Sequence, residues 1–284
     1  MTQTLKAEPL VMDQLEYAEG LRWHAGTLWL SDLFARSVYT LDGDRLERQL
    51  QLDDDEPSGL GFSPNGDPIV VAMKTRQLRT VAAGSATLYA DMWEAASSEC
   101  NDMLIDPSGR AYVSTFGYDL RNGEDAKPGK VILVRPGEAP VVAAGDLIFP
   151  NGIVLTRDGA TLIVSELFGE QLSGYDVAAD GTLSGRRVFA KLPGVAPDGL
   201  AIDAEGGIWV STSTGGEFIR VLDGGEVTHR ISVPDEWTTS CALGGDDGRT
   251  LFMASAATTL EDWFAGKASS NIRTARVEVP GAWL

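Results

Sequence analysis

The sequence FPNGIVL at residues 149–155 is followed by TRDG at residues 156–159 and by TLIVS at residues 161–165. A polar residue and a glycine thus precede a short apolar run, a turn that contains Asp158 and Gly159, and a second apolar run. Short apolar runs on both sides of an Asp-Gly turn are typical of a β-hairpin. We therefore predict one hairpin in this segment.

The same pattern recurs along the chain, so the hairpin belongs to a repeat. The six copies, of which the last is degenerate, begin at Glu19, Ser58, Asn101, Asn151, Asp198 and Cys241. A repeat of about 40–50 residues that contains several short strands is typical of the blades of a β-propeller. The sequence therefore predicts an all-β fold, a six-bladed β-propeller with four antiparallel strands per blade. A β-sandwich is the alternative.

No linker interrupts the repeat, so residues 1–284 are predicted to form a single β-propeller domain. An apolar segment at residues 5–17 precedes the first hairpin, and the last alternating segment lies at residues 273–279. A propeller must close its ring, and pairing the two chain ends in one blade removes exposed strand edges. We expect the N-terminal segment to form the outer strand of the last blade.

The chain carries 41 acidic and 23 basic side chains, which gives a net charge of −18. This charge repels nucleic acids and anionic lipids, so neither nucleic acid nor a membrane is an expected partner. No apolar run reaches the ~18 residues of a membrane span and no signal-peptide pattern begins the chain, so we expect a cytoplasmic monomer or small homo-oligomer. The two cysteines, Cys100 and Cys241, make no disulfide framework, and a bond between them is left open.

The first residue of each copy is expected at the start of the innermost strand, where the blades meet around the axis. Carboxylates and amides then converge there from Glu19, Asn101, Asn151 and Asp198. Acidic groups on one axis repel each other unless a positive group lies between them. Oxygen ligands suit Ca²⁺, Mg²⁺ or Mn²⁺, with Zn²⁺ also open. The sequence predicts one divalent metal ion, Ca²⁺ first; the alternative is that these residues only cap strand ends.

The chain resembles the SMP-30/gluconolactonase/LRE family over nearly its whole length. The motifs that carry the resemblance are Glu19-Gly20 before Trp23, Asn101-Asp102, Pro150-Asn151-Gly152 and Pro197-Asp198-Gly199. The resemblance implies a six-bladed propeller with one divalent metal ion, whose ligands are Glu19, Asn151 and Asp198. It also implies that Asn101 lies beside the metal and contacts the substrate.

One position departs from the family pattern. Members that hydrolyse sugar lactones carry an arginine two residues before this asparagine, whereas the present chain has Glu99. An acid there disfavours anionic substrates. We expect a neutral or cationic, fairly apolar lactone that is bound by Asn101 and Glu99. The apolar wall is expected from Tyr118, Trp263 or Phe264, in two long loops that follow the second strands of the third and sixth repeats.

The resemblance implies a metal-dependent lactonase, a hydrolase that opens a small-molecule cyclic ester. The ion would polarise the lactone carbonyl and activate a water molecule, and Asp198 or Asp102 would take the proton while Asn101 orients the substrate. The residues alone imply only a metal at a polar axis. A non-catalytic propeller that the ion holds together and that binds a partner is therefore an alternative, as is a different metal-dependent reaction on the same scaffold.

Overall fold

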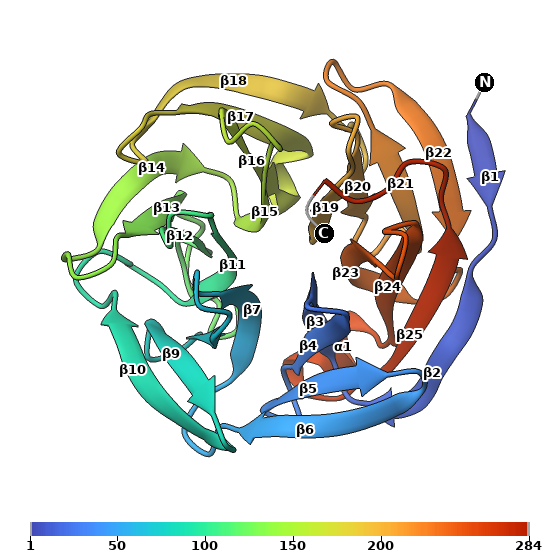
Figure 1. Ribbon diagram of the computed structural model, residues 1–284, viewed down its shortest axis with the longest axis horizontal. Helices are drawn as coiled ribbons and strands as arrows, with labels where there is room; N and C mark the ends of the chain where they lie inside the picture. Colours follow the sequence, from blue (N-terminus) through green and yellow to red (C-terminus); the bar gives the residue numbers. More distant parts are fainter. Residues whose placement is uncertain (1, 283–284) are drawn as a thin grey trace.

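The computed structural model describes residues 2–282, which form six small sheets arranged in a ring (Figure 1). This confirms the all-β, six-bladed propeller with four antiparallel strands per blade. The first three blades consist of β3 (Ala18–His24), β4 (Thr27–Asp32), β5 (Ser37–Asp42) and β6 (Arg45–Gln51); β7 (Pro57–Phe62), β8 (Pro68–Ala72), β9 (Gln77–Ala82) and β10 (Ser85–Asp91); and β11 (Cys100–Ile105), β12 (Ala111–Thr115), β13 (Gly129–Val134) and β14 (Val141–Leu147).

The other three blades follow in chain order around the ring (Figure 1). They consist of β15 (Pro150–Leu155), β16 (Thr161–Glu166), β17 (Gln171–Val177) and β18 (Leu183–Lys191); β19 (Leu200–Ile202), β20 (Ile208–Ser211), β21 (Glu217–Val221) and β22 (Val227–Ser232); and β23 (Trp237–Gly244), β24 (Thr250–Ala257) and β25 (Ser269–Arg276) with β2 (Glu8–Leu15). The hairpin predicted in residues 149–165 is the pair β15 and β16.

The N-terminal segment closes the ring, as the sequence predicts. β2 pairs antiparallel with β25 and is the outer strand of the last blade. One strand was not predicted: β1 (Gln3–Leu5) continues past the closure and pairs in parallel with β22, which gives the fifth blade a fifth strand. The chain start therefore covers the outer edges of two neighbouring blades (Figure 1).

Bulges at corresponding places in the innermost strands position the polar residues of the repeat. The register shifts between Glu19 and Arg22 in β3, and one motif position earlier, from the residue that precedes the polar residue, in β7, β11 and β15. A bulge bends the strand locally and re-aims the side chains beside it. The first residues of the first four copies, Glu19, Ser58, Asn101 and Asn151, all lie at these bulges, so one local device repeats around the ring.

The sixth copy has a different register from the one that its sequence suggests. The bulge of β23 lies between Thr238 and Ser240, whereas Cys241 pairs with Met253 further along the strand. Thr239 therefore occupies the place expected for Cys241, and its hydroxyl donates to the backbone oxygen of Ala18 over 2.6 Å. The sixth copy lacks the pair of a polar residue and a glycine that four of the other five copies have, so its sequence does not mark the position of the bulge. Cys100 and Cys241 are buried and free, with no disulfide between them.

The glycine that follows the polar residue in four of the motifs allows adjacent inner strands to approach closely. A Cβ atom added to Gly152 would lie 2.5 Å from the backbone oxygen of Asp198, and one added to Gly20 would lie 2.5 Å from that of Ser58. Real Cβ atoms do not come so near to backbone, so only glycine fits. The Asn151-Gly152 pair is thus a contact between blades and not a turn.

Replacing Gly152 by Ala is expected to destabilise the protein by about 1–3 kcal/mol or more, because the added methyl overlaps backbone that cannot rotate away. Gly145→Ala is the matched control, since no atom lies within 4 Å of a Cβ there. Urea unfolding of both variants would measure the difference. Equal stability of the two variants would show that the inner strands move apart without penalty.

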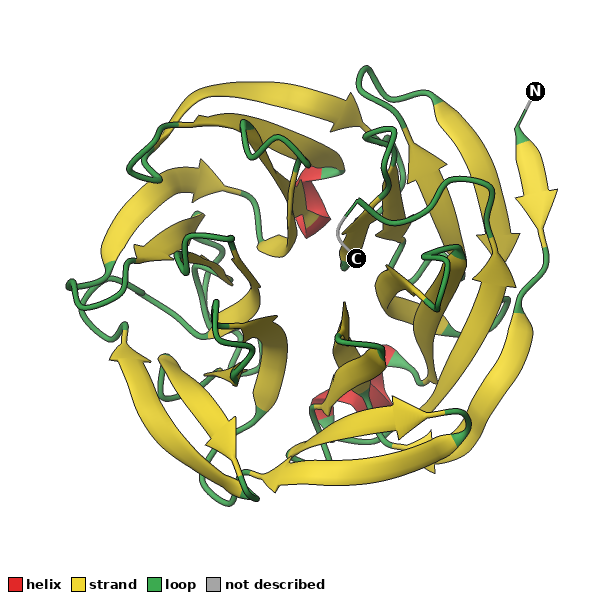
Figure 2. Ribbon diagram, viewed as in Figure 1, coloured by secondary structure: helices red, strands yellow, loops and turns green. Residues whose placement is uncertain are grey.

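The hydrophobic cores lie between neighbouring blades. Val154 and Ile163 of the fourth blade, for example, pack in one buried cluster with Ile208 and Ile219 of the fifth. Each blade therefore buries both faces of its sheet, which is why the inner strands carry nearly continuous apolar runs. The helical segments η1 (Leu167–Gly169) and α1 (Leu260–Phe264) are short, and in the view of Figure 2 both lie inside the outer strands of the ring. Within residues 2–282 no helix has the length and apolar character needed to cross a membrane.

Candidate functional site

One cavity collects the polar residues that the sequence predicts at the axis. Its lining includes Glu19, Asn101, Asn151 and Asp198, which come from four different blades. Phe116, Leu120 and Arg121 line it from the loop after β12, and Leu260 and Trp263 line it from the segment after β24. The two long loops that the sequence singles out thus meet over the same cavity.

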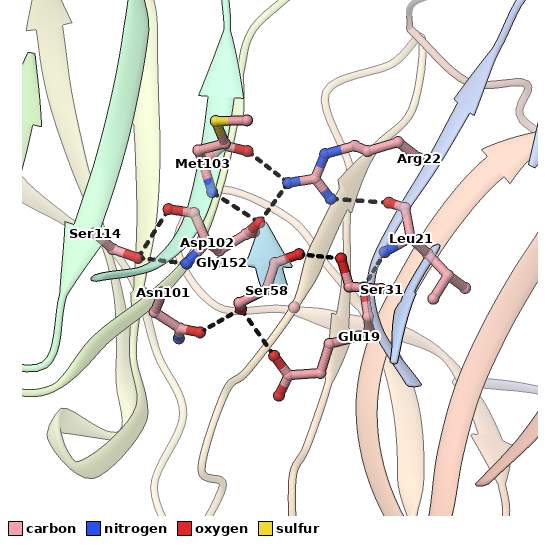
Figure 3. A network of polar contacts seen from close by, with 12 residues as sticks. Glu19, Leu21, Arg22, Ser31, Ser58, Asn101, Asp102, Met103, Ser114 and Gly152 are labelled. Atoms are coloured by element: carbon pink, nitrogen blue, oxygen red, sulfur yellow. Dashed lines mark hydrogen bonds and ion pairs between the residues drawn. The ribbon is translucent and has the colours of Figure 1, made fainter. Parts of the chain in front are cut away.

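Ser58 joins the acid and the amide on one side of this cavity. Its hydroxyl lies 3.0 Å from Oε2 of Glu19 and 2.9 Å from Oδ1 of Asn101, and it can donate to either oxygen (Figure 3). Ser58 is itself fixed through its backbone oxygen, which accepts a hydrogen bond from the Ser31 hydroxyl. With Oδ1 facing Ser58, the amide NH₂ group of Asn101 has no protein partner within residues 2–282.

Asp102 points to a different neighbour from Asn101. Its Oδ1 binds Nη2 of Arg22 over 2.6 Å and accepts from the backbone N–H of Met103 over 2.8 Å (Figure 3). Arg22 also donates to the backbone oxygens of Leu21 and Met103, so its guanidinium ties the first blade to the third. Asp102 does not line the cavity. The two adjacent residues therefore have different roles: Asn101 lines the cavity, and Asp102 forms an ion pair that connects two blades.

Asn151 and Asp198 present side chains that the protein does not satisfy. Both are nearly buried, at 8% and 6% exposure, and within the described part of the chain neither side chain has a hydrogen-bond partner. Desolvation without compensation is unfavourable for an amide and more so for a carboxylate. Their free oxygen atoms face the cavity, which leaves them available to a ligand.

Three acidic side chains lie close together at the site, and burial raises the pKa of each. Burial, and then the charge of Asp102, raises the pKa of Glu19 to about 7 against the opposing effects of the Ser58 hydroxyl and Arg121. Burial, together with the charges of Glu19 and Asp102, raises the pKa of Asp198 well above its usual range. Burial also raises the pKa of Asp102, although Arg22 opposes this. A cation between Glu19 and Asp198 would reverse the rise at both.

The donor set fits a hard divalent ion of the kind that the fold family implies. No cluster of three or more His, Cys, Asp or Glu side chains suited to a metal occurs among residues 2–282. The candidate set is instead two carboxylates and one amide, and such mixed oxygen sets, completed by water, are ordinary for Ca²⁺ and Mg²⁺. The unpaired Asn151 and Asp198 side chains are the observation that supports the fit.

The other predicted site residues are divided between the cavity and its surroundings. Trp263 lines the cavity. Tyr118 lies behind the lining, with its ring 5.5 Å from that of Phe149, and Phe264 is 43% exposed outside it. Glu99 is partly buried and does not line the cavity either; burial raises its pKa and Arg121 opposes the rise.

Several lining residues carried no signal in the sequence. Tyr17 precedes the first motif, and burial together with the charges of Glu19 and Asp198 raises its pKa, which keeps its hydroxyl protonated. Phe149 directly precedes the Pro150-Asn151 motif, and Phe168 lies in η1. Arg121 is the basic residue of the lining, and only its place in a long loop after an inner hairpin could have drawn attention to it.

Comparisons with known proteins show which family and which structures this chain is similar to. A family model described as SMP-30/Gluconolactonase/LRE-like region matches residues 17–257. A 6-deoxy-6-sulfogluconolactonase from Pseudomonas putida is 31% identical over 265 residues, which cover 89% of this chain and 88% of that protein. A regucalcin from Xenopus laevis is 27% identical over 271 residues, 92% of this chain and 90% of that protein. Among solved structures, a calcium-binding protein from Agrobacterium tumefaciens, regucalcin, has a TM-score of 0.82 at 24% identity and covers 99% of this chain and 97% of its own.

Proposed function

Because the chain belongs to the SMP-30/gluconolactonase/LRE-like family, we propose that it is a hydrolase that opens a lactone with the help of one divalent metal ion. The name of the relative from Pseudomonas putida, a sulfogluconolactonase, supports lactone hydrolysis. The observation that carries the proposal is the pair of buried, unpaired side chains of Asn151 and Asp198 at a cavity that also contains Glu19 and Asn101.

Glu19, Asn151 and Asp198 are the residues that would hold the ion. Ca²⁺ is the first choice because the donors are carboxylate and amide oxygens, and Mg²⁺, Mn²⁺ and Zn²⁺ are the others. When bound, such an ion supplies polarisation of the ester carbonyl and activation of a water molecule. The name of the Agrobacterium tumefaciens neighbour, a calcium-binding protein, is in line with this choice.

Side chains of the protein itself carry out proton transfer and substrate binding. Asp198 takes the proton from the attacking water at its carboxylate, since Asp102 is engaged with Arg22 and does not line the cavity. Asn101 uses its free NH₂ group to hold the lactone oxygen, because its Oδ1 is turned to Ser58. The neutral hydroxyl of Tyr17 is a further donor to the substrate.

A pH-indicator screen of aliphatic, aromatic and sugar lactones, with and without chelator, tests the proposal. We expect hydrolysis of at least one class, its loss after chelation, and its recovery when excess Ca²⁺ is added. Full activity in a chelated, metal-free sample would overturn the metal requirement. No turnover of any lactone with any of the four ions would favour a non-catalytic propeller.

A further inference from the structure

Apart from its polar end, the cavity is walled by apolar side chains. They come from segments far apart in the chain and comprise Leu33, Met73, Phe116, Leu120, Phe149, Leu167, Phe168, Ala196, Trp237, Leu260 and Trp263. Two of them stand at the rim although they are large and apolar, Phe168 at 51% exposure and Leu260 at 60%. Exposed apolar residues around a cavity mark a surface that an apolar ligand covers.

This wall is unsuited to a polyhydroxylated lactone. The hydroxyl groups of a sugar need hydrogen-bond partners, and beyond the axis residues and Tyr17 the polar side-chain groups of the lining are those of Ser213, Thr214 and Arg121 and the two indole N–H groups of Trp237 and Trp263, of which the N–H of Trp263 is buried. Each buried hydroxyl left without a partner lowers affinity roughly 5- to 150-fold. An alkyl or aryl substituent instead gains roughly fourfold in affinity for each methylene that it buries.

Arg121 gives the wall one directed hydrogen-bond donor. Its Nη1 binds Oε2 of Glu56 over 2.5 Å, and its guanidinium carbon lies 5.0 Å from the centre of the Trp263 ring. These contacts fix the planar group, while Nε and Nη2 have no hydrogen-bond partner in residues 2–282. A fixed guanidinium with free N–H groups at a cavity is placed to bind an oxygen acceptor.

The charges around Arg121 favour a neutral acceptor. Glu56 binds Arg121 through one oxygen and Lys74 through the other, over 2.7 Å, so the two bases share this carboxylate. Glu99 and Asp119 add negative charge, and both interact electrostatically with Arg121. An anionic ligand group would therefore meet acids behind the one arginine, whereas an amide or ester carbonyl accepts from Arg121 without this repulsion.

We infer that the substrate is a lactone that carries an apolar substituent joined through a neutral carbonyl group, which Arg121 holds while the aromatic wall covers the substituent. An acylamino lactone has this chemistry. The inference rests on the proposed lactonase function, and it names the substrate class of that site.

Binding of γ-lactams, which are not hydrolysed readily, tests the inference apart from catalysis. Trp237 and Trp263 line the cavity, so intrinsic fluorescence reports occupancy. We expect Kd of Ca²⁺-loaded protein to fall from the unsubstituted lactam to a short and then a long acylamino lactam, by roughly fourfold per buried methylene. A polyhydroxylated lactam and a carboxylated lactam should bind no better than the unsubstituted ring.

Variants at the rim test whether these particular apolar residues bind the substituent or whether any exposed apolar residue has the same effect. Leu260→Ser and Phe168→Ser should each weaken binding of the long acylamino lactam roughly three- to tenfold, and binding of the unsubstituted lactam by a smaller factor. Leu88→Ser is the matched control, since Leu88 is also 60% exposed but lies on β10 away from the cavity. Arg121→Met should lower the ratio of the affinity for acylamino lactams to that for simple alkyl lactams roughly tenfold.

The same series of lactones, measured as kcat/KM, keeps the two proposals apart. Hydrolysis of acylamino lactones with the order of preference seen for the lactams supports both. Lactam binding in the expected order without hydrolysis of any lactone would sink the proposed function, and the inference would then hold only for the class of ligand that the wall and Arg121 bind. Preference for the polyhydroxylated or the carboxylated compound, or no dependence on chain length, would overturn the inference even if lactones are hydrolysed.

Discussion

Asp198→Asn is expected to abolish lactone hydrolysis, with kcat reduced roughly 10³-fold or more, while the metal-free protein becomes more stable. The substitution keeps the volume of the side chain but removes a metal ligand and the proton acceptor. It also removes one of the negative charges that Glu19 and Asp102 face in a buried site. Loss of activity and gain of stability have the same cause, since an unpaired buried carboxylate is unfavourable until a cation binds.

Thermal unfolding with chelator and with excess Ca²⁺ measures both effects. In the wild type an ion at about 100 times its Kd adds about 2.7 kcal/mol of stability, whereas the variant should show a much smaller increase from a higher starting Tm. Asp158→Asn is the control, because Asp158 lies in an exposed turn and binds Thr156 and Ala160. Wild-type turnover in Asp198→Asn, or an undiminished stabilisation by the ion, would remove Asp198 from the metal site.

The repeat made the fold predictable because four of its six motifs combine two physical requirements. The polar residue at the bulge faces the axis, and the glycine beside it allows the neighbouring strand to approach, as at Asn151 and Gly152. Both requirements leave a mark in the local sequence. The sixth copy lacks the polar residue and the glycine. The sequence therefore predicts the bulge of β23 two residues too late, at Cys241 instead of Thr239. β1 was missed because a short outer strand has no apolar pattern of its own.

The cavity wall could be predicted only in part, because loops determine it. Spacing indicated that the segments after β12 and β24 overhang the axis, and Trp263 does line the cavity. Which side chain of a loop turns inward depends on contacts that the local sequence does not record. Arg121 is held by Glu56, which is far away in the chain. Asn101 and Asp102 were both expected near the substrate, yet neighbouring residues of a strand point to different sides.

Asn101→Ala is expected to lower kcat roughly 10²- to 10³-fold while the stabilisation by Ca²⁺ stays at the wild-type value. The reason is that Asn101 offers the substrate oxygen an NH₂ group whose orientation Ser58 fixes, and the loss of one such donor has an effect of this size. The three proposed metal ligands remain in place. Kinetics at saturating Ca²⁺ and thermal unfolding over a Ca²⁺ titration give the two values. A reduced affinity for Ca²⁺ in this variant would mean that Asn101 is a metal ligand.

A double-mutant cycle with Ser58→Ala determines how Asn101 is positioned. If Ser58 acts on catalysis through the hydrogen bond to Oδ1 of Asn101, its removal lowers kcat roughly tenfold in the wild type and has no further effect in Asn101→Ala. The Ser58 hydroxyl also lies 3.0 Å from Oε2 of Glu19, which offers a second route. Along that route Ser58→Ala would weaken Ca²⁺ binding and would lower kcat equally in both backgrounds. Equal losses would therefore assign Ser58 to Glu19 and leave the amide of Asn101 to be oriented by the substrate itself.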